Sequence, residues 1–253
     1  LAYDLGLRAV QAIGSALDVL LFQIAVRAHD SHGESHAKAQ VAHNMAIVFA
    51  VLAPACVGLW IVLPSVEILI VPEAFRGPFA HFLGLMLPGL FFYGMTQFAI
   101  HPIFQIARQT RPLVLAALAA CVADPVFILI LPRGDDASSL AIAQSLALAV
   151  GFVTLIGFAR ATKPQWPRLR DLALTAAACA GMVALDAPLR AWSPGLGLML
   201  VQIALGGGFY AAAVAIFDIA GLRGALVEKM TPILTRLSRK GGIFKLLLPL
   251  RLG

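Results

Sequence analysis

The chain has 253 residues, of which 60% are apolar and only 13% are charged, and its mean hydropathy is +0.88. A soluble domain is about 45–50% apolar and about 25% charged, so this composition indicates an integral membrane protein with several spans. The formal net charge of +6 does not indicate nucleic-acid binding, because the basic residues lie in alternate segments between apolar runs and near the C-terminus.

Seven apolar runs are long enough to cross the hydrocarbon core of a bilayer, for which an α-helix needs about 20 residues. They are Leu5–Val26, Ala42–Leu63, Phe79–Phe104, Leu113–Leu131, Leu140–Phe158, Leu172–Leu189 and Leu196–Phe217. We therefore predict an all-α integral membrane protein with about seven transmembrane helices. The loops are too short to hold an inserted soluble domain. Pro54, Pro88, Pro102 and Pro125 are expected to break their helices locally.

Lysine and arginine are distributed unevenly between the two sides of these spans. The fifteen that follow spans one, three, five and seven are Arg27, Lys38, Arg108, Arg111, Arg160, Lys163, Arg168, Arg170, Arg223, Lys229, Arg236, Arg239, Lys240, Lys245 and Arg251. Arg76, Arg133 and Arg190 follow the other three spans. Because positive loops stay in the cytoplasm, we predict a multi-pass protein of the inner (cytoplasmic) membrane whose C-terminus is cytoplasmic.

Two polar segments are predicted on the cytoplasmic side. Residues 28–41 are interpreted as a polar loop that holds His29, His32 and His36. Three histidines so close together could bind a metal ion, but their spacings come without a helical or cysteine context, so no metal site is predicted. The segment Asp218–Gly253 is basic with an apolar face, and we expect it to lie along the anionic inner leaflet.

Signatures of enzymatic chemistry are missing from the sequence. It contains no phosphate-binding P-loop, no nucleophile elbow and no zinc-protease motif. We therefore predict no catalytic residues and no cofactor. Ionisable residues within the spans are the remaining candidates for function, because a charge at mid-bilayer costs roughly 2.5–3.5 kcal/mol on insertion scales and normally faces a cavity or a partner.

The first span carries Asp4 and Arg8, four residues apart and therefore on one helix face. Either the two pair with each other, or both line a water-filled cavity in which Arg8 meets an anionic substrate. His101 is either a proton-linked switch or a solvated interfacial residue. Asp124 is either a coupling-ion or proton site or a buried, hydrogen-bonded structural acid.

The stretch FQIARQTRP forms a short basic turn between two spans, and its distinctive positions are Phe104, Ala107, Arg108, Thr110 and Pro112. Three further stretches are AYDLGLRAVQAIGSAL, LAPACVGLWIVLPSVEILIVPEAF and SLAIAQSLAL. In this order, the turn and the three stretches resemble a turn and helices in the C-terminal half of a flippase of the multidrug/oligosaccharidyl-lipid/polysaccharide exporter superfamily. Both the polysaccharide-transporter branch and the lipid II flippase branch of that superfamily are similar.

The resemblance implies a division of the chain and a set of partners. Residues 1–160 would be the C-terminal transport lobe with about five spans and its first span missing, 161–217 two additional transmembrane helices, and 218–253 a basic amphipathic tail. The implied substrate is a polyprenyl-diphosphate-linked glycan. Membrane lipids and the missing N-terminal lobe of the same protein would be its other partners. Where lipid II flippases place an arginine directly after the acid, this sequence has Leu5, which favours the general polysaccharide branch.

Glycan flipping has three alternatives, of which one is a membrane scaffold partner without a transport role. A cation-coupled multidrug exporter of the same superfamily would carry a cluster of membrane acids in one lobe, whereas the acids here are scattered. A membrane glycosyltransferase or polysaccharide polymerase would need long outer loops that carry reactive side chains. The outer loops here, 64–78, 132–138 and 187–195, are short and sparse.

Overall fold

The computed structural model describes residues 2–132 and 137–224, without the side chains of residues 28–32 and 34. Its helices are α1 Ala2–His32, α2 Glu34–Ile70, α3 Pro78–Met95, α4 His101–Ile106, α5 Arg111–Ile130, α6 Ser138–Ala161, α7 Leu169–Asp186 and α8 Leu196–Phe217. Short 3₁₀ turns cover Glu73–Phe75, Ala187–Ala191 and Ile219–Gly221, and a π-helical segment, Thr96–Ile100, joins α3 to α4.

The prediction of seven spans in an all-α protein is confirmed. Seven helical stretches of the described chain are long and apolar enough to cross a membrane, and α3, the π segment and α4 together form one of them, Pro78–Ile106. The described residues contain helices and turns but no strand. The chain is therefore a multi-pass helical membrane protein.

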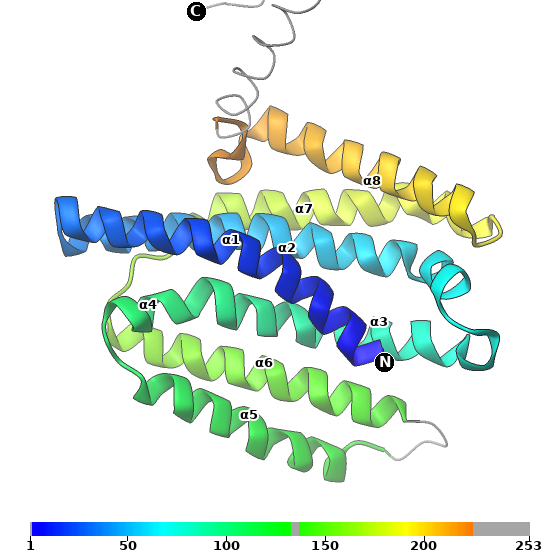
Figure 1. Ribbon diagram of the computed structural model, residues 1–253, viewed down its shortest axis with the longest axis horizontal. Helices are drawn as coiled ribbons and strands as arrows, with labels where there is room; N and C mark the ends of the chain where they lie inside the picture. The colour runs from blue at the N-terminus through cyan, green and yellow to red at the C-terminus, as the bar shows by residue number, and fades with distance from the viewer. Residues whose placement is uncertain (1, 133–136, 225–253) are drawn as a thin grey trace, which may run out of the picture.

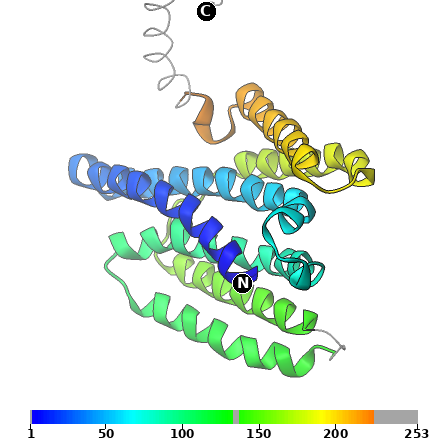
Figure 2. The same cartoon turned by 45° about the vertical axis from the view of Figure 1, so that its right-hand side comes forward.

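The helices lie roughly side by side, with α1 crossing in front of α2 and α3 (Figures 1 and 2). Helices α5 and α6 pack together at one side of the bundle, while α7 and α8 pack on α2 at the other. One end of the bundle, here called the basic end, holds Gly33, the turn 107–110 and the connection 162–168. The end with the α2–α3 and α7–α8 connections is called the opposite end.

Small residues set how closely the central helices approach one another. A Cβ added to Gly89 of α3 would lie 2.6 Å from the backbone Cα of Ser145 on α6, and one added to Gly94 would lie 2.8 Å from Val10 of α1. The side chains of Leu52, Leu83 and Leu90 have no exposed surface in the same core. Helix α3 is therefore the element against which α1, α2 and α6 assemble.

The polar loop predicted over residues 28–41 is wrong, because this segment is helical. Helix α1 runs to His32 and α2 begins at Glu34, so that only Gly33 interrupts the two helices, with φ +82°. Alanine, glutamate, lysine and glutamine favour helix as strongly as most apolar residues do, and glycine adopts a positive φ without steric cost. The polar residues of this segment therefore extend the two helices and do not form a loop.

The expected helix breaks at proline are wrong at three of the four positions. Helices α2, α3 and α5 continue through Pro54, Pro88 and Pro125. Proline removes one backbone donor, but neighbouring helices and local adjustments make the loss tolerable in a membrane-spanning helix. Only Pro102 lies at a change of helix, since it follows the π segment in the first turn of α4.

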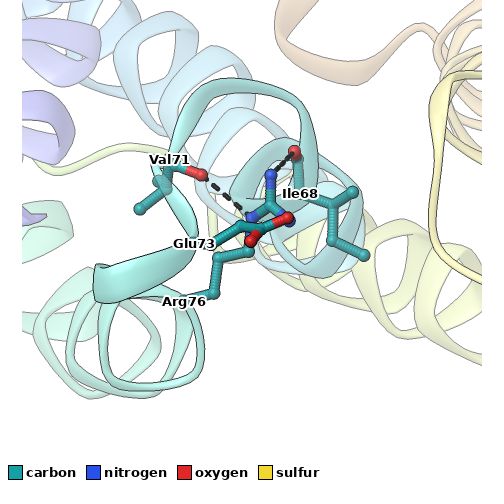
Figure 3. Close-up of polar contacts among 4 residues, drawn as sticks. All are labelled: Ile68, Val71, Glu73 and Arg76. Carbon is teal, nitrogen blue, oxygen red and sulfur yellow. Dashed lines mark hydrogen bonds and ion pairs between the residues drawn. The ribbon is translucent and has the colours of Figure 1, made fainter.

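A polar turn joins α2 to α3 at the opposite end (Figure 3). The Arg76 guanidinium donates from Nη2 to the carbonyl oxygen of Ile68 at 2.9 Å and from Nε to that of Val71 at 3.0 Å, and its Nη1 lies 3.5 Å from Oε1 of Glu73. The carbonyl groups at the end of a helix have no partner within the helix. Arg76 therefore caps the end of α2 and fixes the turn that begins α3.

Candidate substrate-binding face

Helix α1 carries a stripe of polar residues along one side. Because an α-helix has 3.6 residues per turn, residues spaced alternately by four and three share a face. The stripe consists of Asp4, Arg8, Gln11, Ser15 and Asp18. The first four are exposed in the folded chain and Asp18 is half-buried. A polar surface thus runs along a helix that is otherwise apolar enough to cross the membrane.

A different side of α1 holds the helix against the bundle. A Cβ added to Gly6 would lie 2.5 Å from Leu90 of α3, and one added to Gly14 would overlap the ring of Phe98. Val10, between these two glycines, is buried. This close packing fixes the rotation of α1, and the rotation in turn leaves the polar stripe uncovered by the rest of the described chain.

Polar groups from α3 and α6 lie beside the stripe. The Gln11 side-chain amide donates to the hydroxyl oxygen of Tyr93 on α3 at 3.3 Å. Tyr3 lies close to Tyr93 and to the side chain of Gln144 on α6. Three helices therefore contribute hydroxyl and amide groups to one face. We call the stripe, together with Tyr3, Tyr93 and Gln144, the α1 polar face.

The two charged residues singled out in the first span lie on this face. Asp4 and Arg8 are one helical turn apart, and both are exposed in the folded chain. Both side chains are thus presented to whatever covers the face. Their role in substrate binding stays a prediction.

His101 and Asp124 do not lie with Asp4 and Arg8. His101 is half-buried at the start of α4, and α4 lies at the basic end (Figure 1). Asp4 lies in the first turn of α1, which begins nearer the opposite end (Figure 1). Asp124 is half-buried on α5, which packs mainly against α6. The structure therefore does not bring the four predicted site residues into one site, and the roles weighed for His101 and Asp124 stay open.

The family-like turn lies between α4 and α5 at the basic end. Phe104 is fully buried and anchors the turn, while Ala107, Arg108 and Thr110 are exposed. The Gln109 amide donates to the carbonyl oxygen of Phe104 at 2.9 Å, and Arg108 adopts a positive φ of +53°. Pro112 lies in the first turn of α5, where proline suits a helix start. The described contacts give this segment a structural task, which is to reverse the chain.

Reasoning from the sequence missed most of the α1 polar face. Gln11 and Ser15 continue the spacing begun by Asp4 and Arg8, so helical periodicity was a signal for them. Tyr93 and Gln144 gave no such signal, since each is an isolated polar residue in an apolar run. Among the described residues, no group of three or more His, Cys, Asp or Glu could hold a metal ion, and the side chains of His29 and His32 lie outside the description.

Comparison with known proteins places the fold. No protein-family model and no curated protein sequence matches the chain. Among solved structures, the chain is similar to the lipid II flippase MurJ in an inward closed conformation, with a TM-score of 0.68 and 18% sequence identity. The match covers 85% of this chain and 44% of that one. The chain therefore has the fold of part of that flippase and spans less than half of its length.

Proposed function

We propose that the chain forms one lobe of a membrane transporter that flips a lipid-linked oligosaccharide or polysaccharide precursor across the cytoplasmic membrane by alternating access. The observation that carries this proposal is the α1 polar face, an uncovered row of charged and polar side chains on a membrane-spanning helix. The similarity in fold to a lipid II flippase supports it.

The energetics of the polar stripe argue against a lipid-facing α1. Each charged side chain near the middle of the bilayer costs roughly 2.5–3.5 kcal/mol on insertion scales, so charges within spans usually face water, protein or substrate. The stripe carries Asp4, Arg8 and Asp18 on one span. The proposal is that a second lobe of the same protein covers this face and leaves a water-filled cavity between the two lobes.

The chemistry of the face fits a glycan joined to lipid through a diphosphate. Arg8 offers a permanently charged, planar donor group that suits phosphate oxygens. Asp4, one turn away, would orient Arg8 and keep lipid away from it. Tyr93, Gln11 and Gln144 offer hydroxyl and amide groups of the kind that pair with sugar hydroxyls. Under this proposal no covalent bond changes, so no catalytic residue is assigned.

Replacement of Arg8 by alanine in the full-length protein tests the proposal. We expect Arg8→Ala to reduce export of surface polysaccharide at unchanged expression, because the diphosphate would lose its charge partner. Arg8→Lys should retain part of the activity, since the charge remains but the planar pair of donors does not. Arg160→Ala, at an exposed arginine of the basic end, is the matched control and should leave export intact. Normal export with Arg8→Ala would refute the assigned role.

A further inference from the structure

A second polar cluster lies at the opposite end of the bundle, away from the α1 polar face. Asp186, the last residue of α7, is 4% exposed, and Gln202 of α8 is 6% exposed. The Gln202 amide nitrogen donates to one carboxylate oxygen of Asp186 at 2.7 Å, and Nε of Arg190 donates to the other at 3.3 Å. The carboxylate of Asp186 is thus shared between an amide and a guanidinium.

One buried atom in this cluster has no partner. The side-chain oxygen of Gln202 accepts no hydrogen bond from any described residue. Leaving a buried acceptor unpaired costs roughly 1–3 kcal/mol, so such atoms usually have a further donor. Gln202 lines a cavity of about 390 Å³ that is also bordered by α2, α3 and the segment that follows α7. A molecule in this cavity is therefore the natural source of the donor.

The mouth of the cavity combines aromatic rings with unused donors. The guanidinium carbon of Arg190 lies 4.7 Å from the centroid of the Trp60 ring, a cation–π arrangement. The Arg190 side chain is 51% exposed, and only its Nε has a hydrogen-bond partner among the described residues. Trp192 is exposed beside it, and both tryptophans line the cavity.

This combination selects a neutral, hydroxyl-rich ligand. A sugar hydroxyl can donate to the Gln202 oxygen while a neighbouring hydroxyl accepts from Arg190. A phosphate group would bring its negative charge next to the carboxylate of Asp186, which already offsets the charge of Arg190. Indole rings offer an apolar surface for the C–H face of a sugar ring, next to groups that fix its orientation.

We propose that the cavity between Gln202, Arg190, Trp60 and Trp192 binds a sugar ring. The ring could come from a soluble saccharide or from the headgroup of a membrane glycolipid, which share this chemistry. The proposal goes beyond the transport function and uses none of the residues assigned to it. A structural role for the cluster alone, as a pin between α7 and α8 with interfacial tryptophans, predicts no sugar binding.

The three tryptophans of the chain allow a direct test, because Trp60 and Trp192 line the cavity whereas Trp166 lies at the basic end. In a Trp166→Phe background, all tryptophan emission arises from the cavity. The full chain is titrated with N-acetylglucosamine in an amine-oxide detergent, since alkyl maltosides carry a sugar themselves. We expect a saturable change in emission with a Kd on the order of 1–10 mM, the weak affinity typical of one small contact surface.

Two variants and two further probes make the result decisive. Gln202→Met should weaken binding about tenfold or more, a loss of about 1.4 kcal/mol. Arg190→Lys, which keeps the charge beside Asp186 but loses the planar donors, should also weaken it, while Gln165→Met at the basic end should not. Octyl glucoside, used below its micelle concentration, is compared with glucose. A lower Kd for octyl glucoside would assign the ring to a glycolipid. Equal Kd values would assign it to a soluble saccharide.

Three outcomes would overturn the sugar assignment. In the first, N-acetylglucosamine does not change the tryptophan emission. In the second, the Gln202→Met and Arg190→Lys variants give the same titration curve as the parent protein. In the third, inorganic phosphate saturates the emission change and the sugar does not. Emission maxima and elution profiles of the unliganded variants show whether each has folded. The titration involves no transport, so its failure is separate from a failure of the Arg8→Ala export experiment.

Discussion

Glu67 is a carboxylate that the fold uses for a structural purpose. It is 8% exposed, near the end of α2, and its Oε1 accepts hydrogen bonds from the backbone amides of Gly77 and Ala80, each at 2.8 Å. The first amide groups of a helix have no partner within the helix, and a negative charge near them is favourable. Glu67 therefore caps the start of α3 from the neighbouring helix.

Replacement of Glu67 by alanine should lower the free energy of unfolding by roughly 1–3 kcal/mol, since the backbone amides of Gly77 and Ala80 lose their hydrogen bonds to a charged acceptor. Glu73 offers a control in the same turn, because its side chain is 89% exposed and makes only an ion pair with Arg76. Glu73→Ala should change the free energy of unfolding by less than about 1 kcal/mol. Denaturant unfolding in a fixed detergent measures both, and equal losses would contradict the capping role.

At the scale of elements, helix α3 packs closely against the backbone of α6 at Gly89. The Cβ position of Gly89 lies 2.6 Å from the Cα of Ser145, whose hydroxyl donates to the carbonyl oxygen of Leu85 at 2.7 Å. Small residues and hydroxyl groups are the usual means by which membrane helices approach closely. This contact joins the half of the bundle that carries α5 to the half that carries α1.

A methyl group at Gly89 should force the two helices apart, because a backbone atom cannot move aside as a side chain can. We expect Gly89→Ala to destabilise the folded chain by about 1–3 kcal/mol. Gly157→Ala on α6 is the matched control, with no atom within 4 Å of its added Cβ, and it should be neutral or slightly stabilising. Thermal unfolding of both proteins tests this, and similar midpoints would show that α6 shifts freely.

At the scale of the whole molecule, the uneven distribution of charge predicts an orientation. The basic end holds the turn with Gln109, and the opposite end holds Ser193, which is exposed between α7 and α8. In a background with the native cysteines Cys56, Cys121 and Cys179 replaced by alanine, a membrane-impermeant maleimide should label Ser193→Cys in intact cells. Gln109→Cys should react only after permeabilisation, because the positive end stays in the cytoplasm. The reverse pattern would invert the topology.

Much of this architecture was readable from composition along the chain. Hydropathy over about 20 residues locates spans because the bilayer demands internal backbone hydrogen bonding, which a helix provides. Hydropathy fails at residues 28–41, because its fall marks where the chain leaves the membrane and does not mark where a helix ends. For the site, periodicity on α1 reveals Asp4 and Arg8, while Tyr93 and Gln144 gain meaning only by lying next to that helix.

The sequence by itself determined the helical class, the number of spans and the charge asymmetry between the two ends, since these depend on local composition. Only the tertiary structure decided which polar groups meet. Gln11 bonds to Tyr93, 82 residues away, and Gln202 bonds to Asp186 across the α7–α8 connection. Such contacts depend on how each helix is rotated and how closely it approaches its neighbours. That rotation is set by packing at a few small residues, among them Gly14 and Gly89, which hydropathy does not register.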